Sequence, residues 1–263
     1  MSGSFGETLF MCCYYISIGS IALLCNSVNL FIYTETREMR RKYLYYIALE
    51  LAEVVNSVSF ILTGIGRGQA LLNGVIRAPT TTHECFYQHF WTHSLIVGEE
   101  LPTLVVILLA VERICAVARP SLYSRLFEFP AKPYPLAFTF SLGLVSLFLA
   151  AVSAYGNERV FMSRHCPIIN GTDLWYAMSH FCFIVFGHAI AFISLLLVHW
   201  YSKVLRFTHF LFSNNATELT IAMYFKGTCI LLVSSPGVVM IGIAQHLWQP
   251  GDLTVAIAYA MTA

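Results

Sequence analysis

Long apolar segments recur along this sequence, and they constrain its fold more than any other feature. Six segments reach the length of about 20 mostly apolar residues that a membrane-spanning helix needs, and a seventh begins near residue 253. Only 11% of the 263 residues are charged and 57% are hydrophobic, a surface that lipid solvates better than water does. The sequence therefore predicts an all-α membrane protein, a seven-transmembrane helix bundle with a truncated seventh helix, in a single domain over 1–263. The expected helices cover residues 10–33, 43–66, 86–118, 135–155, 174–201, 219–247 and, incompletely, 253–263.

Lysine and arginine in the short connectors predict the orientation of the bundle, because cytoplasmic loops carry an excess of both. Most of these residues fall on one side. The other side carries only Arg67, Arg77, Arg159 and Arg164. We therefore expect a multi-pass protein of the plasma membrane with its N-terminus outside. The sequon that begins at Asn170 then lies outside and is a glycosylation candidate, whereas the sequon at Asn215 lies inside. A net charge of +1 argues against a nucleic-acid partner.

The cysteines divide between the apolar segments and the outer loops. Six of the eight lie within or at the ends of apolar segments, where cysteine behaves as a small hydrophobic residue. Only Cys85 and Cys166 fall in predicted outer loops, and the oxidising outer face permits a bridge there. Two unpaired thiols are the alternative.

One segment resembles the signature of a known family. Glu112-Arg113-Ile114 is followed by Pro120, seven residues after the arginine, and then by Ser121-Leu122-Tyr123. This pattern resembles the acidic-Arg-Tyr motif that ends the third helix of rhodopsin-like (class A) G-protein-coupled receptors. Further positions that are similar to the family pattern are Asn26 in the first helix, Leu49 and Glu53 in the second, and Pro236 in the sixth.

The departures from that pattern are also informative. The fourth helix has no Trp, and Ser234 and Ser235 precede Pro236 where the family often has Cys-Trp. Leu95 stands at the position of the acidic residue in amine-binding members, which argues against a biogenic amine as the ligand. With the many Phe and Tyr residues, these features are more similar to the divergent nematode chemoreceptor (serpentine receptor) branches.

The resemblance implies a function. A chain of this family would be a ligand-activated, chemosensory receptor that responds to an extracellular small molecule or peptide and signals to a heterotrimeric G protein. It would have no catalytic activity and no cofactor. The resemblance also implies a disulfide between Cys85 and Cys166, and an activation switch. The switch residues would be Glu112, Arg113, Pro120, Asn26, Glu53 and Pro236.

Within that switch, the resemblance assigns two roles. Arg113 would hold the cytoplasmic ends of the third and sixth helices together through Glu112 or Glu218, with simple anchoring at the membrane interface as the alternative. Glu53 would line a sodium and water pocket. Pro102 replaces the serine that often binds the ion there, which argues against sodium.

Carboxylates and histidines inside the apolar segments mark a candidate ligand pocket, because ionisable groups at membrane depth are usually functional. Its predicted residues are His89, His93, Glu99, Glu100 and His188. Adjacent helix positions point about 100° apart, so at least one of the two glutamates faces the interior. It would meet a ligand there, or form an internal pair with His188.

Two other classes of protein remain as alternatives. His89 and His93 are four residues apart and would share one helix face, a spacing that also fits a metal site. A seven-helix membrane metalloenzyme is therefore one alternative, although a catalytic zinc normally needs a third ligand. A channel or transporter subunit is the other, but the sequence has no charged pore ring and no helix pair interrupted by Gly or Pro.

The last apolar segment is short. Residues 253–263 would extend only about 16 Å as a helix, whereas the hydrocarbon core of a bilayer is about 30 Å thick. We therefore expect this sequence to represent an incomplete receptor.

Overall fold

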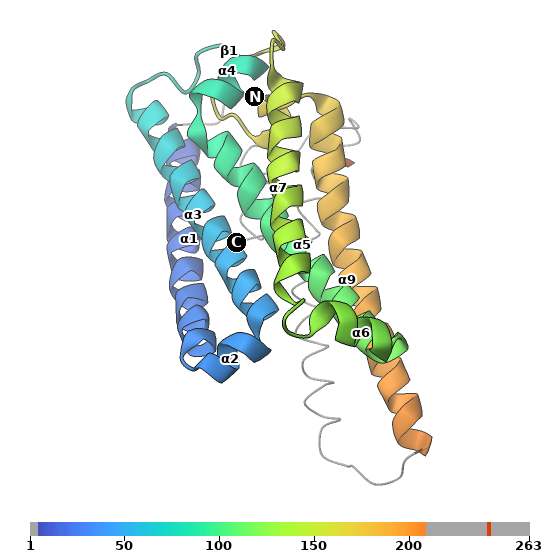
Figure 1. Ribbon diagram of the computed structural model, residues 1–263. Helices are drawn as coiled ribbons and strands as arrows, with labels where there is room; N and C mark the ends of the chain where they lie inside the picture. Colours follow the sequence, from blue (N-terminus) through green and yellow to red (C-terminus); the bar gives the residue numbers. More distant parts are fainter. Residues whose placement is uncertain (1–4, 209–240, 243–263) are drawn as a thin grey trace.

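Five long helices dominate the computed structural model, which describes residues 5–208 and 241–242. All five are long and apolar enough to cross a membrane (Figure 1). They are α1 (Phe5–Thr34), α3 (Leu44–Leu72), α5 (Phe90–Ala118), α7 (Pro133–Ala154) and α9 (Leu174–Thr208). The prediction of a helical membrane protein is confirmed. The expected sixth and seventh helices, together with Pro236, Glu218 and Asn215, lie outside the described residues.

Short elements connect the long helices at both ends. At the end where the N-terminus lies (Figure 1), two antiparallel strands pair Thr80 with Phe161 and Thr81 with Val160. These strands and the neighbouring short helices are β1 (Thr80–Thr81), β2 (Val160–Phe161), α4 (Thr82–Gln88) and α8 (Ile168–Gly171). The opposite end carries α2 (Arg37–Lys42) and α6 (Pro120–Phe127).

The predicted start of the third spanning helix at residue 86 is wrong. The backbone of His89 is extended and separates α4 from α5, so the spanning helix begins at Phe90. The cause is local, because α4 has its own capping box. The backbone N–H of Glu84 donates to the Thr81 hydroxyl (3.1 Å), and the N–H of Thr81 donates to the Glu84 carboxylate (3.0 Å). A capping box satisfies backbone donors at a helix start and so stabilises a separate helix there.

Glycine allows α1 and α3 to pack at close range. A Cβ atom on Gly19 would lie 2.8 Å from the carbonyl oxygen of Ser57, and one on Gly64 would lie 2.8 Å from that of Cys12. Small residues let membrane helices approach in this way. Between the same two helices, Asn26 donates from its amide to the Ser57 hydroxyl (3.3 Å).

Helix α5 lies at the centre of the bundle and contacts α3, α7 and α9. Fully buried apolar side chains such as Ile96 of α5 and Phe60 of α3 pack in this core. Large apolar side chains such as Phe31 and Leu144 point outward and are exposed. An apolar outer face is what a helix bundle presents to lipid.

Candidate functional site

A buried ionisable cluster lies between α5 and α9. The ring of His180 is positioned between two carboxylates, with its Nδ1 2.7 Å from Oε1 of Glu100 and its Nε2 3.1 Å from Oε2 of Glu99. All three side chains are buried. Two ring nitrogens directed at two carboxylates match an imidazolium that donates to both.

Two hydroxyl groups hold Glu100 in place. Ser146 of α7 donates to Oε1 of Glu100 (2.9 Å), and Tyr176 of α9 donates to the same oxygen (3.2 Å). Together with the bond from His180, this oxygen receives three hydrogen bonds from two other helices. Buried charges require such partners. Glu100 therefore ties α5, α7 and α9 together.

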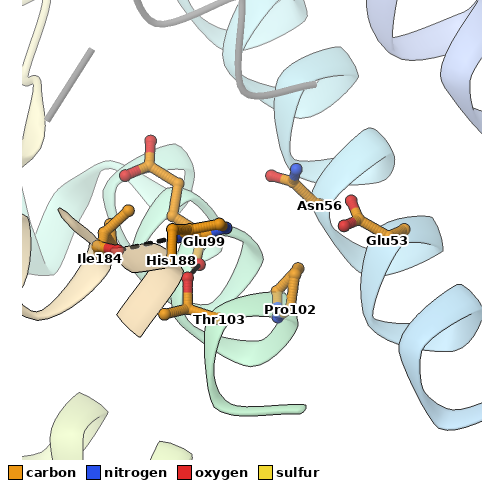
Figure 2. A pocket seen from close by; sticks show the side chains of 7 residues that line it. All are labelled: Glu53, Asn56, Glu99, Pro102, Thr103, Ile184 and His188. Atoms are coloured by element: carbon orange, nitrogen blue, oxygen red, sulfur yellow. Dashed lines mark hydrogen bonds between the residues drawn. The ribbon is translucent and has the colours of Figure 1, made fainter. Parts of the chain in front are cut away.

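Glu99 differs from Glu100, because one of its oxygens is unused. Its Oε1 atom is buried and has no hydrogen-bond partner among the described residues. The Glu99 side chain lines a cavity of about 40 Å³ between α3, α5 and α9 (Figure 2). The other lining residues are Glu53, Asn56, Pro102, Thr103, Ile184 and His188. Two carboxylates from different helices thus border one small polar space.

The internal pair involves a different histidine from the expected one. The ring of His188 does not reach the glutamates; its Nδ1 donates to the carbonyl of Ile184 on its own helix (2.8 Å). Because that nitrogen carries the proton, Nε2 of the neutral ring is an acceptor. His180, which binds both glutamates, was absent from the predicted pocket.

His89 and His93 do not form a joint site. His89 precedes α5, so the expectation that the two residues share one helix face is wrong. The ring of His89 stacks on Trp91 (4.5 Å between centroids), and that of His93 contacts Phe86 (4.2 Å). Within residues 5–208 and 241–242, no group of three or more His, Cys, Asp or Glu side chains is arranged to hold a metal ion.

At the opposite end of α5, the predicted switch residues have other partners. Arg113 is half-buried and donates to the hydroxyl of Tyr46 on α3, with its guanidinium 5.9 Å from the centre of that ring. Glu112 forms an ion pair with Lys132 (3.4 Å), and Lys132 also donates to the carbonyl of Lys42 (3.1 Å). Arg113 therefore contacts α3, the second spanning helix, and its predicted partner Glu112 binds Lys132 instead. Pro120 is the first residue of α6.

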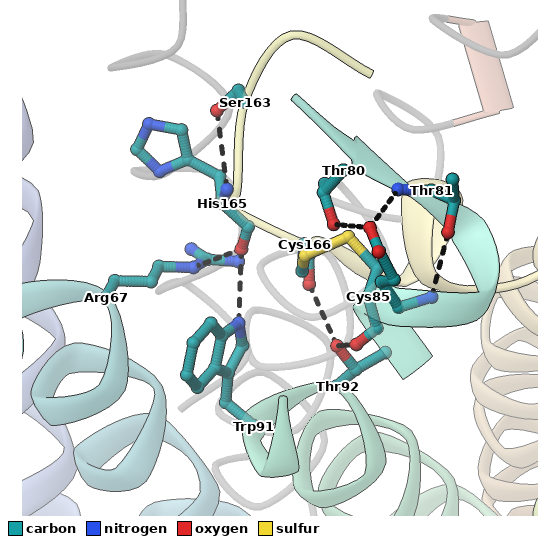
Figure 3. Close-up of a disulfide and its surroundings, with 10 residues drawn as sticks. Arg67, Thr80, Thr81, Cys85, Trp91, Thr92, Ser163, His165 and Cys166 are labelled. Atoms are coloured by element: carbon teal, nitrogen blue, oxygen red, sulfur yellow. Dashed lines mark hydrogen bonds between the residues drawn. A yellow bond between two sulfur atoms is a disulfide. The ribbon is translucent and has the colours of Figure 1, made fainter. Parts of the chain in front are cut away.

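A disulfide fixes the loops at the N-terminal end of the bundle (Figure 3). Cys85 and Cys166 are bonded, with their Cα atoms 5.3 Å apart, which confirms the predicted bridge. The carbonyl of His165 accepts hydrogen bonds from Arg67 Nε (2.8 Å) and Trp91 Nε1 (3.2 Å). These contacts attach the segment before Cys166 to α3 and α5 at this end of the bundle.

Asn170 lies in α8, at this same end of the molecule. Its side chain is half-buried, and Thr172 of the same sequon is buried, with its hydroxyl donating to the carbonyl of Ile168 (2.8 Å). The folded loop therefore presents the asparagine only partly to solvent.

Comparisons with protein-family models and with curated protein sequences find no match. The two features that bear on function are therefore the His180 cluster with its cavity and the polar contacts of Glu112 and Arg113.

His165, the residue before Cys166 of the disulfide, is expected to make the loops at this end of the bundle sensitive to acid. Burial, reinforced by the nearby Arg67 guanidinium, lowers the pKa of His165 from its ordinary 6.5 to about 4. The unfolded chain then binds a proton that the folded chain does not, so the stability present above pH 6.5 is lost as the pH falls toward 4. We expect the free energy of unfolding to fall by about 2 kcal/mol between pH 7.5 and pH 5 from this group.

Unfolding of the purified protein at the two pH values measures this effect. In the His165→Gln variant, which has no titrating ring, the contribution should disappear, while His83→Gln serves as a control in the same region. An equal acid sensitivity in wild type and His165→Gln would contradict the assignment.

Proposed function

We propose that this chain is a ligand-activated membrane receptor that passes an extracellular signal to a heterotrimeric G protein. In this proposal the chain is a chemosensory member of the rhodopsin-like class, in the plasma membrane with its N-terminus outside. The observation that carries the proposal is the charged cluster of Glu99, Glu100 and His180, buried within the bundle beside a polar cavity. Charges at membrane depth are costly and are usually retained for function.

A single helix joins this cluster to the other end of the bundle. Glu99 and Arg113 both belong to α5 and are separated by about 21 Å along its axis. A small shift of α5 at the cavity would therefore move Arg113 against Tyr46 and Glu112 against Lys132. Packed helices respond to ligands by such discrete shifts. These contacts support the proposal that Arg113 belongs to a switch.

Replacing Arg113 with alanine is expected to reduce G-protein activation by about tenfold, which is a typical size for the coupling between two sites. The reason is that the contact between α5 and Tyr46 of α3 is lost, while the buried cluster stays intact. Cells that express the full chain with a broadly coupling G protein, exposed to a panel of small water-soluble and volatile compounds, provide the measurement. Nucleotide exchange is the signal, and surface expression is recorded in parallel.

The matched control is Arg119→Ala, since Arg119 is an exposed arginine directly after α5. It should signal like the wild type. If the wild-type chain activates no G protein with any compound, the receptor proposal fails. If Arg113→Ala signals as well as Arg119→Ala, Arg113 is only an interface anchor.

A further inference from the structure

We propose that the cavity beside Glu99 binds an ammonium group, the charged head of a protonated primary amine. The inference deepens the proposed function, and it rests on that function only for its role in signalling. The binding itself follows from the contacts of Glu99, from the charge of its cluster and from the residues across the cavity.

The unused oxygen of Glu99 is the first argument. The side chain is only 7% exposed, and its Oε1 has no partner among the described residues, whereas its Oε2 is bound to His180. A buried polar atom without a hydrogen bond is costly, and one next to a cavity points to a missing donor. Glu100, in contrast, has three donors on one oxygen.

Charge is the second argument. Two carboxylates around one imidazolium leave the cluster with one negative charge, and Glu53 also lines the cavity, as a third carboxyl group. Among the lining residues that the structure describes, none is a lysine or arginine. A net negative charge in a low-dielectric interior strongly favours a cation.

The third argument selects an ammonium group over a metal ion. Hard cations such as sodium and calcium prefer a shell of oxygen atoms, but the residues that line this cavity include His188, a histidine whose Nε2 is an acceptor. An ammonium group has three N–H donors, and the cavity offers an acceptor from each of three helices. These acceptors belong to Glu53 of α3, Glu99 of α5 and His188 of α9, all of which line the cavity and are labelled in Figure 2.

The size of the cavity is consistent with this ligand. One water molecule needs about 10–15 Å³ of such space, so about 40 Å³ accommodates an ammonium group with its first methylene. Leu95 stands where amine-binding members of the family have an acidic residue. On α5, Glu99 lies one helical turn after Leu95, so this helix carries a carboxylate one turn deeper in the bundle.

Thermal unfolding of the full chain in nanodiscs tests the proposal, with methylammonium chloride as the probe. Ionic strength is held constant with tetramethylammonium chloride, which has the same charge but no N–H donor. We expect the unfolding temperature to rise by about 3–6 °C at a methylammonium concentration ten times Kd. Sodium chloride at matched ionic strength should give no rise.

Two variants localise the effect. Glu99→Gln removes the charge at nearly constant shape and should abolish the rise. Glu50→Gln is the matched control, because Glu50 lies on α3 but binds Asn29 (3.4 Å) and does not line the cavity; its rise should equal that of the wild type. If Glu99→Gln does not fold, His188→Phe, which removes the acceptor nitrogen, takes its place.

Three outcomes would overturn the proposal. These are no rise with methylammonium in the wild type, an equal rise with sodium or tetramethylammonium, and an undiminished rise in both cavity variants. None of these measurements involves a G protein. If methylammonium raises the unfolding temperature but no G protein is activated, the receptor proposal is refuted and the ammonium site stands. If a G protein is activated but methylammonium gives no rise, the ammonium site is refuted and the receptor proposal stands.

Discussion

Replacing His180 with alanine is expected to lower the free energy of unfolding by about 3–5 kcal/mol, the usual cost of removing one partner from a buried ion pair. His180 is 2% exposed and contacts the carboxylates of both Glu99 and Glu100. Without the ring, two adjacent carboxylates would remain in the interior with no opposite charge between them. Chemical or thermal unfolding of the protein in detergent measures the loss.

His188→Ala is the matched control for this substitution. His188 is a buried histidine of the same helix, but its recorded bond goes to a carbonyl of its own helix. Both substitutions remove an imidazole ring of the same size, so each variant loses a similar amount of stability from the space left behind. The hydrogen bond of His188 adds only about 1 kcal/mol to its loss. Glu99→Gln and Glu100→Gln, added to His180→Ala, should recover much of its loss. Equal losses for the two histidines would contradict a charged role for His180.

Removing the disulfide is expected to cost about 4 kcal/mol. The bond between Cys85 and Cys166 closes a loop with a sequence separation of 81 residues, and cross-links over long loops restrict the unfolded chain most. The double variant Cys85→Ala/Cys166→Ala should therefore unfold at a clearly lower temperature than the wild type. Its surface expression should fall as well, because a less stable chain is degraded more often.

Free cysteines of the same protein provide the control. Cys115 and Cys182 are half-buried and unbonded, so Cys115→Ala and Cys182→Ala should change stability by less than about 1 kcal/mol. A reductant should destabilise the wild type and these two variants, but leave the double variant unchanged. Stability that is independent of both the reductant and the double substitution would show that the bridge has no structural role.

The parts of the fold that depend on composition were predictable from the sequence. Apolar runs identified all five described spanning helices, because a bilayer demands a nearly continuous apolar surface over about 20 residues. The disulfide was predictable for a similar reason, since Cys85 and Cys166 are the cysteines outside those runs. In both cases a strong environmental constraint leaves few alternatives.

The sequence did not distinguish His180 from His188 as the partner of the glutamates. Both histidines belong to α9, at about 9 Å and 21 Å along it, and Glu99 lies about 14 Å along α5, so its depth alone selects neither histidine. The start of α5, in contrast, had a signal in the sequence, because the capping box at Thr81 and Glu84 marks a separate helix before it.

At the other end of α5, no sequence signal indicated that Glu112 would pair with Lys132 instead of Arg113. In the sequence, Lys132 is only one of the basic residues of a connector, yet in the structure it lies against Tyr45 and binds Glu112. Such a contact depends on how the loop folds back onto the bundle, since 20 residues separate the two ends of the ion pair. Neither the periodicity nor the composition of the sequence predicts how this loop folds.

The close contact of α1 with α3 has a consequence for how the bundle moves. With backbone against backbone at Gly19 and Gly64, neither helix has the layer of side chains that would let it slide or rotate past the other. We therefore expect α1 and α3 to move together as one rigid unit. The contact of α5 with α9 is different, because it contains the buried charges of Glu99, Glu100 and His180 and borders the cavity. We therefore expect relative movement between α5 and α9 rather than between α1 and α3.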